Sequence, residues 1–134
     1  MARRVGIICA LALLAAGCGV RSSKPFTAAG TAGCLRSHGF TQVTTDPGKV
    51  GFIAGFADLG GIKATSPTRN VLTIAFTADA DSTGDTEDAF TAHAPKRLQR
   101  HMADIMSTNR NAVLVWTITP RSDELDTVNR CLKP

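Results

Sequence analysis

Residues 112–119 read AVLVWTIT and predict a β-strand more clearly than any other stretch of the chain. β-Branched and aromatic residues of this kind are enriched in strands. Successive side chains of a strand point to opposite faces, which puts Val113 and Val115 on one face and Leu114, Trp116 and Ile118 on the other. Because both faces are apolar, we expect this strand to lie in the interior of a sheet.

Three further stretches predict partner strands, at residues 40–45, 62–66 and 71–78. The third places Leu72, Ile74 and Phe76 on one face at a period of two. Residues 67–70, PTRN, are typical of a turn between antiparallel strands.

Four helices are predicted around these strands, at residues 27–38, at 47–57, from Asp85 to an exit at 109–111, and from Ser122 to Leu132. Asp46 can cap the second helix, and Pro47 suits its first position because that position needs no N–H donor. Asp85 and Ser122 are the expected starts of the last two helices. Pro95 is expected to kink or split the third helix.

The order helix, strand, helix, strand, strand, helix, strand, helix resembles a ferredoxin-like βαββαβ core with one extra helix at each end. This resemblance implies an α+β, two-layer sandwich formed by a single domain, residues 27–134. It also implies that the first and last strands are antiparallel neighbours, which would bring Cys34 close to Cys131.

The first residues of the chain have the features of an export signal. Arg3 and Arg4 precede an apolar run at residues 5–16, within the roughly 7–15 residues typical of a signal peptide. The run is shorter than the about 20 residues that a transmembrane helix needs. We therefore expect residues 1–17 to be removed.

The end of this signal resembles the bacterial lipobox. Ala16, Gly17 and Cys18 match it, whereas Ala15 stands where leucine is usual and Leu14 lies one position further out. The resemblance implies an acylated Cys18, a tether at residues 18–26 and a lipid anchor at the extracytoplasmic face of the cell membrane. Two or three acyl chains make a durable anchor. The alternative is an ordinary secretory signal, in which Cys18 has no role.

Two cysteines remain in the mature chain, because Cys9 lies in the signal and Cys18 receives the lipid. In an oxidising compartment we expect Cys34 and Cys131 to form a disulfide. The alternatives are two free thiols or a metal pair, but no C-x-x-C spacing or further zinc ligand is evident. Closing so long a loop restricts the unfolded chain by about 4–5 kcal/mol.

Composition and motifs argue against several function classes. The net charge of +4 includes Arg3 and Arg4, the chain has no tyrosine, and its aromatic content is 5%, so we expect no nucleic-acid partner. Asp79-x-Asp81 with Gly84 matches the start of a calcium loop, but the position of its bidentate glutamate is Phe90. We expect no metal and no cofactor, and we expect surface or packing roles for the histidines, His38, His93 and His101. No nucleophile motif is present, and the chain is predicted not to be an enzyme.

The apolar segment at residues 50–62 has two interpretations. It can pack on the sheet, with Gly51-x-x-x-Gly55 allowing close backbone approach, or it can leave part of its surface exposed. In the second case an apolar ligand or the membrane contacts the exposed side chains, Phe52, Ile53, Phe56 and Leu59. The chain is thus expected to be a non-enzymatic accessory or protein-interaction module with an unidentified envelope partner, or alternatively a binder of a lipid or other apolar ligand.

The whole chain also resembles small uncharacterised lipoproteins of high-GC bacteria. These proteins combine a lipobox with a late N-x-V-x-V-W-like strand and a C-terminal cysteine, here Asn111, Val113, Val115, Trp116 and Cys131. The resemblance implies a location and no activity.

Overall fold

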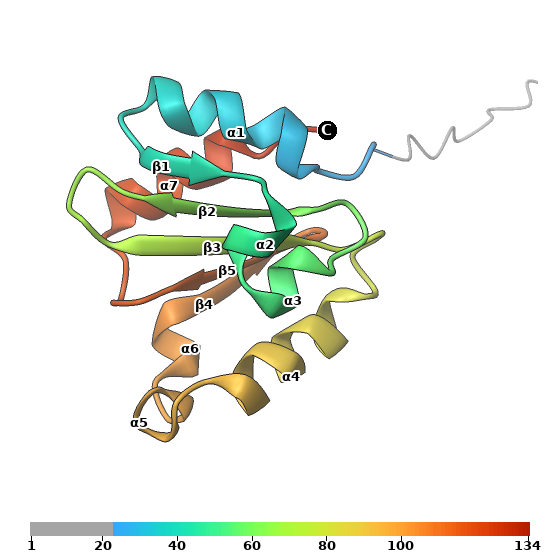
Figure 1. Cartoon of the computed structure of the whole chain (residues 1–134), viewed down its shortest axis with the longest axis vertical. Coiled ribbons are helices and arrows are strands. Elements are labelled where there is room, and N and C mark those ends of the chain that lie inside the picture. Colours follow the sequence, from blue (N-terminus) through green and yellow to red (C-terminus); the bar gives the residue numbers. More distant parts are fainter. Residues whose placement is uncertain (1–22) are drawn as a thin grey trace, which may run out of the picture.

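A five-stranded antiparallel sheet runs through the computed structural model, which describes residues 23–134 (Figure 1). The predicted signal peptide and Cys18 lie outside the described residues. The strands are β1 (Thr41–Thr44), β2 (Gly61–Thr65), β3 (Val71–Phe76), β4 (Met106–Asn109) and β5 (Ala112–Trp116). Their order across the sheet is β1-β2-β3-β5-β4.

Helices cover both faces of this sheet. They are α1 (Ala28–Ser37), α2 (Pro47–Val50), α3 (Phe52–Gly55), α4 (Thr83–His93), α5 (Lys96–Gln99), α6 (Met102–Ile105) and α7 (Ser122–Cys131). The α+β class is therefore confirmed. α1 and α7 pack together on one side, and α2, α3 and α4 contact β2, β3 and β5 on the other (Figure 1). Within residues 23–134, no helix has the length and apolar character needed to cross a bilayer.

The predicted interior strand is confirmed, and its register explains the core. β5 lies between β3 and β4, and Val113 and Leu114, which point to opposite faces, are both fully buried. The expected period in β3 is also present, since Leu72, Ile74 and Phe76 are all buried. The prediction for Ile118 is wrong: β5 ends at Trp116, and Ile118 is 67% exposed beyond it.

The strand pairing implied by the ferredoxin-like resemblance is wrong. The first strand, β1, pairs with β2 at one edge of the sheet, whereas β5 pairs with β3 and β4. Parallel strands need a long crossover, usually a helix. The predicted helix over residues 47–57 would serve as one, but Gly51 adopts φ +99° and divides it into α2 and α3. After α2 and α3 the chain returns as β2, which pairs antiparallel with β1.

The third predicted helix is divided by Pro95, as expected, but its last part is a strand. α4 ends at His93, α5 and α6 are short, and residues 106–109 form β4. The turn to β5 at Arg110 has φ +54°, the left-handed conformation that two-residue hairpins favour. The predicted helix exit is therefore a hairpin turn.

The domain begins earlier than predicted, within the expected tether at residues 18–26. Phe26 is buried and the Arg110 guanidinium carbon lies 4.2 Å from its ring centroid. Arg110 also donates to the carbonyl oxygens of Ser23 and Lys24, at 3.1 and 2.7 Å. Residues 23–26 are therefore held on the domain surface.

The two ends of the domain meet through α1 and α7. Thr27 N donates to Lys133 O at 2.9 Å, and Cys34 and Cys131 form the expected disulfide, with their Cα atoms 5.3 Å apart. The disulfide is therefore confirmed. The two cysteines are brought together by the packing of α1 on α7, and not by the strand pairing from which their proximity was inferred.

Candidate functional site

An exposed aromatic pair lies on α3. Phe52 is 74% and Phe56 80% exposed, and their ring centroids are 5.0 Å apart. Residues four apart share one side of a helical turn. Ala54 of α3 and Val50 of α2 are buried against Ala75 of β3. Both interpretations of this segment therefore hold in part: one side packs on the sheet and the other faces solvent.

Two glycines let α3 fit tightly between α2 and the sheet. A Cβ atom at Gly55 would lie 2.6 Å from the carbonyl oxygen of Pro47, and one at Gly61 would lie 2.5 Å from that of Ala54. The expected close approach at Gly55 thus involves α2, whereas Gly61 makes the approach to the sheet. This packing fixes the outward direction of the α3 aromatic pair.

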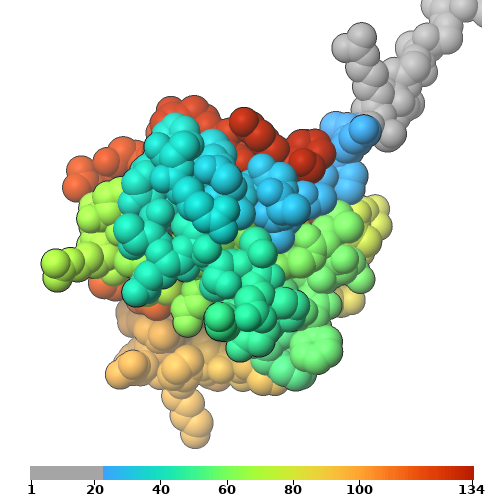
Figure 2. Space-filling model, turned by 45° about the horizontal axis from the view of Figure 1, so that its top comes forward, coloured from blue at the N-terminus to red at the C-terminus, as the bar shows by residue number. Residues whose placement is uncertain are grey.

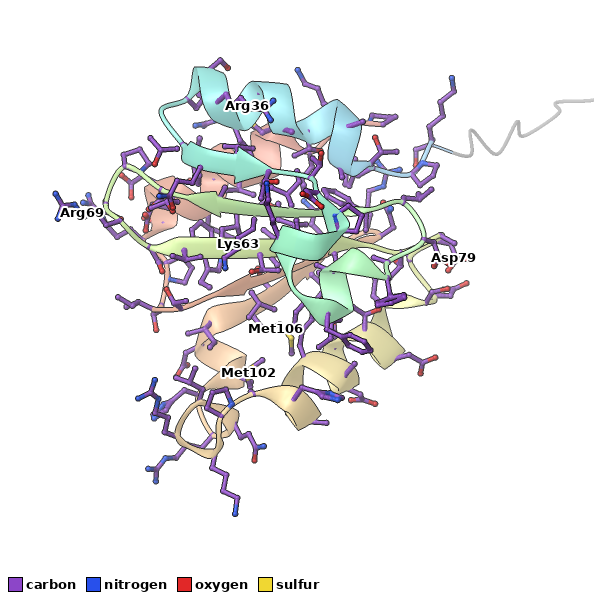
Figure 3. All side chains as sticks on the ribbon, in the orientation of Figure 1. Arg36, Lys63, Arg69, Asp79, Met102 and Met106 are labelled. Carbon is purple, nitrogen blue, oxygen red and sulfur yellow. A yellow bond between two sulfur atoms is a disulfide. The ribbon has the colours of Figure 1, made fainter. Side chains whose placement is uncertain are left out.

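A cleft lies between α3, the helices α4 to α6 and the sheet, and we call it the α3–α6 cleft. Its volume is about 190 Å³, and its apolar lining includes Ile53, Phe90, Leu98, Met102, Ile105 and Val115. The label for Met102 in Figure 3 marks the α6 end of this region. Its polar lining includes Thr73, His93 and Thr117. The α3–α6 cleft is therefore an apolar recess with a few polar groups.

Comparison of the chain with family models, curated proteins and solved structures gives no match. Function has to be argued from the site itself, because a fold alone does not imply one.

The four residues expected to contact an apolar ligand or the membrane occupy different surroundings. Phe52 and Phe56 are exposed, and Ile53 lines the α3–α6 cleft. Leu59 is partly buried against the main core, and its N–H donates to Phe76 O at 2.9 Å. Leu59 therefore packs against the core, and its contact with a ligand or the membrane stays a prediction.

Positive charges lie at the α5 end of the cleft. Lys96, Arg97 and Arg100 are exposed, and this part of the chain projects from the lower end of the domain (Figure 2, orange). Leu98, between them in sequence, lines the cleft. An apolar recess with a basic rim is thus available at this surface.

The acidic segment before α4 has a local structural role. The backbone N–H and the hydroxyl of Ser82 donate to Asp79 Oδ1 at 2.9 and 2.7 Å, in a loop at the edge of the domain (Figure 3). The hydroxyl bond from Ser82 is the main cause of a lowered pKa at Asp79. α4 begins at Thr83, close to the predicted start near Asp85, which lies in the first turn.

A buried carboxylate, Glu124, holds the start of α7. It accepts hydrogen bonds from the hydroxyls of Ser66, at 2.5 Å, and Thr68, and from the N–H of Arg121, at 3.0 Å. Burial raises the pKa of Glu124, but these hydrogen bonds outweigh burial and the pKa is lowered. The predicted cap, Ser122, is therefore wrong; Arg121 is the N-cap, and Glu124 binds its backbone.

His38 is the functional candidate that sequence reasoning missed. Its Nδ1 lies 3.7 Å from the sulfur atoms of both Cys34 and Cys131. The available signal was the spacing Cys34-x-x-x-His38, which places both side chains on one side of a helix. The other two histidines are on the surface, where His101 contacts Asp104 at 3.8 Å and His93 lies 2.9 Å from Ala89 O.

Proposed function

We propose that this chain is a bacterial lipoprotein, anchored through Cys18 at the extracytoplasmic face of the cell membrane, with a non-enzymatic domain that binds a partner protein. The sequence of residues 14–18 supports the anchor. The single observation that carries the interaction role is the exposure of Phe52 and Phe56 beside the α3–α6 cleft.

Exposed aromatic pairs are effective contact residues. Fully burying an exposed phenylalanine side chain contributes about 1.5–3 kcal/mol before the costs of association. Aromatic side chains are enriched in the cores of protein interfaces. Phe52 and Phe56 are already 5.0 Å apart and held by α3, so little additional ordering is needed on binding.

The size of the α3–α6 cleft favours a protein partner. Pockets for drug-sized ligands span about 300–1,000 Å³, whereas this cleft holds about 190 Å³. A cavity of about 150 Å³ accommodates one benzene molecule. The α3–α6 cleft therefore fits one or two apolar side chains of a partner segment.

The basic rim suggests the charge of that segment. Lys96, Arg97 and Arg100 are exposed at the α5 end of the cleft, and charges across interfaces are usually complementary. We expect a partner segment with one or two apolar anchors followed by acidic residues.

Site-specific photo-crosslinking in the bacterial membrane tests this proposal. A photoreactive phenylalanine analogue replaces Phe56 in the full chain, and another replaces Ile118, which is also exposed but lies beside Asn70 at the other end of β3. The expected result is a discrete crosslinked protein from position 56 alone, lost when Phe52 becomes aspartate. Equal crosslinking from both positions, or none from position 56, would contradict the proposal.

Binding of a lipid or other apolar ligand is the second candidate, favoured by the apolar lining of the α3–α6 cleft. In the same experiment it predicts lipid adducts at position 56 in place of a protein adduct. It also predicts a bound mass in native mass spectrometry that the Phe56→Asp variant lacks.

The anchor has a separate test. The intact mass of the membrane-extracted protein should show a chain beginning at Cys18 with acyl groups attached. A secreted chain without acyl groups would contradict the lipoprotein proposal while leaving the interaction surface open to the crosslinking test.

A further inference from the structure

The disulfide between α1 and α7 has a third donor group beside it. Cys34 and His38 lie one helical turn apart, and Cys131 approaches from the end of α7. The two sulfur atoms and the nearest ring nitrogen all lie within 4.8 Å of one another. Thiolate sulfur and imidazole nitrogen are the two commonest donors to zinc in structural sites.

The distances between these donors suit a shared metal ion. With Zn–S of about 2.3 Å, Zn–N of about 2.0 Å and a tetrahedral angle, a sulfur and a nitrogen on one zinc are about 3.5 Å apart. His38 Nδ1 is 3.7 Å from Sγ of Cys34 and 3.7 Å from Sγ of Cys131. Both sulfur–nitrogen distances are thus nearly in place, and only the two bonded sulfurs have to separate, to about 3.8 Å.

We propose that reduction of this disulfide converts Cys34, His38 and Cys131 into a three-ligand site for zinc or another thiophilic divalent cation. A dithiol reductant supplies two electrons and two protons, which gives two cysteine thiols while the dithiol becomes a disulfide. Binding of Zn²⁺ then releases one proton from each thiol, because thiolates are the ligands.

His38 has to present an unprotonated nitrogen to the metal. Its Nδ1 now lies 2.9 Å from Cys34 O and 3.2 Å from Ser37 Oγ. Because the ring is exposed, a proton on Nδ1 can move through water to Nε2, which leaves Nδ1 free as a ligand. The three protein ligands leave the fourth zinc position to water or to a ligand from solution.

The metal would preserve the link between the two helices. Cys34 lies in α1, His38 is the C-cap residue of that helix, and Cys131 lies in α7, so either the disulfide or the metal ion connects the same two helices. The site thus provides a crosslink when the disulfide is reduced.

Titration with Co²⁺, a spectroscopic substitute for zinc, tests the proposal. The protein is the full chain in detergent with Cys9→Ser and Cys18→Ser, so that no other thiol competes. After reduction by a phosphine we expect one equivalent of Co²⁺ to bind, with thiolate-to-metal absorption, and none to bind before reduction. His38→Ala should weaken binding at least about tenfold, and the matched surface variant His101→Ala, at an exposed histidine outside the α3–α6 cleft, should not.

Circular dichroism before the titration reports whether the reduced protein is folded. If it is folded and takes no Co²⁺, or if His38→Ala binds as tightly as the parent, the proposal is overturned. If reduction unfolds the chain, the proposal requires that Zn²⁺ restore the native circular dichroism spectrum of the parent protein but not that of His38→Ala. Equal recovery of the spectrum in the two proteins, or no recovery in either, would also overturn the proposal.

Discussion

Asn111 joins three segments of the domain through one buried amide. Its side chain oxygen accepts from Phe26 N at 2.8 Å, and its nitrogen donates to Phe26 O at 2.9 Å and Thr77 O at 2.8 Å. The residue is 2% exposed. Substitution by alanine would leave three buried backbone groups without their partner.

The expected loss follows from these three bonds. Each contributes about 1 kcal/mol net, and a buried group left unpaired costs roughly 1–3 kcal/mol. We therefore predict that Asn111→Ala lowers the free energy of unfolding by about 3–5 kcal/mol. At roughly 4 °C per kcal/mol for a domain of this size, the melting temperature should fall by about 12–20 °C.

Urea denaturation at neutral pH with the disulfide intact is the assay. The only tryptophan, Trp116, is 1% exposed, so its fluorescence reports loss of the core. Asn109→Ala is the matched control, since Asn109 lies in β4 before the same turn and makes one partly buried side-chain bond, to Asn129 at 3.0 Å. That variant should lose less than about 1 kcal/mol. A loss at position 111 no larger than at position 109 would refute the reasoning.

Three further predictions concern acid, crosslinking and backbone conformation. The folded-state pKa of Glu124 is below its ordinary 4.5, so the ionised carboxylate stabilises the fold above that pH, and this contribution is lost as pH falls through the folded-state pKa. The difference in unfolding free energy between wild type and Glu124→Gln should therefore shrink on acidification. A difference that stays constant in urea denaturation from pH 6 to 3 would contradict this prediction. The disulfide closes a loop with a sequence separation of 97, so the double variant Cys34→Ala, Cys131→Ala should have an unfolding free energy lower by about 4–5 kcal/mol. A loss under 1 kcal/mol in urea denaturation would argue against this stabilising role. Gly51→Ala should destabilise the fold by about 1–2 kcal/mol because the backbone φ at this position is +99°. Gly33→Ala, in α1 with open space around it, should stabilise the fold by about 0.5–1 kcal/mol. Thermal melts in which both substitutions change the stability in the same direction would exclude this explanation.

Long periodic segments could be predicted from sequence and short ones could not. The pattern of Leu72, Ile74 and Phe76 identified β3 and its buried face, because a strand with one consistent face has few alternatives. Gly51 was expected to allow close backbone approach, and the sequence pattern did not indicate its positive φ, which divides the segment into α2 and α3.

Local turn chemistry accounts for the second error in the fold. Residues 102–109 continue a helical apolar pattern, yet Arg110 adopts a left-handed conformation and residues 106–109 pair with β5. Hydrogen bonds to an adjacent buried strand outweigh the weak helical preference of a short segment.

Sequence reasoning named Phe52, Ile53 and Phe56 as contact candidates but not the cleft beside them. Phe52 and Phe56 were identified because they lie in an almost uncharged segment. Their exposure, the burial of Leu59 and the neighbouring α3–α6 cleft all depend on where α3 to α6 lie against the sheet. His38 was missed because its partner Cys131 is 93 residues away in sequence, a separation that no local pattern reports.

The hydrogen bond between Thr27 N and Lys133 O has a consequence for re-engineering the chain. Because the start and end of the domain are neighbours, a short Gly/Ser linker should join them without disturbing α1 or α7. New ends can then be opened in the exposed loop at residues 78–81. If the chain is anchored through Cys18 as proposed, such a circular permutant would present the α3–α6 cleft to the bilayer in a different orientation and would show whether partner binding depends on that orientation.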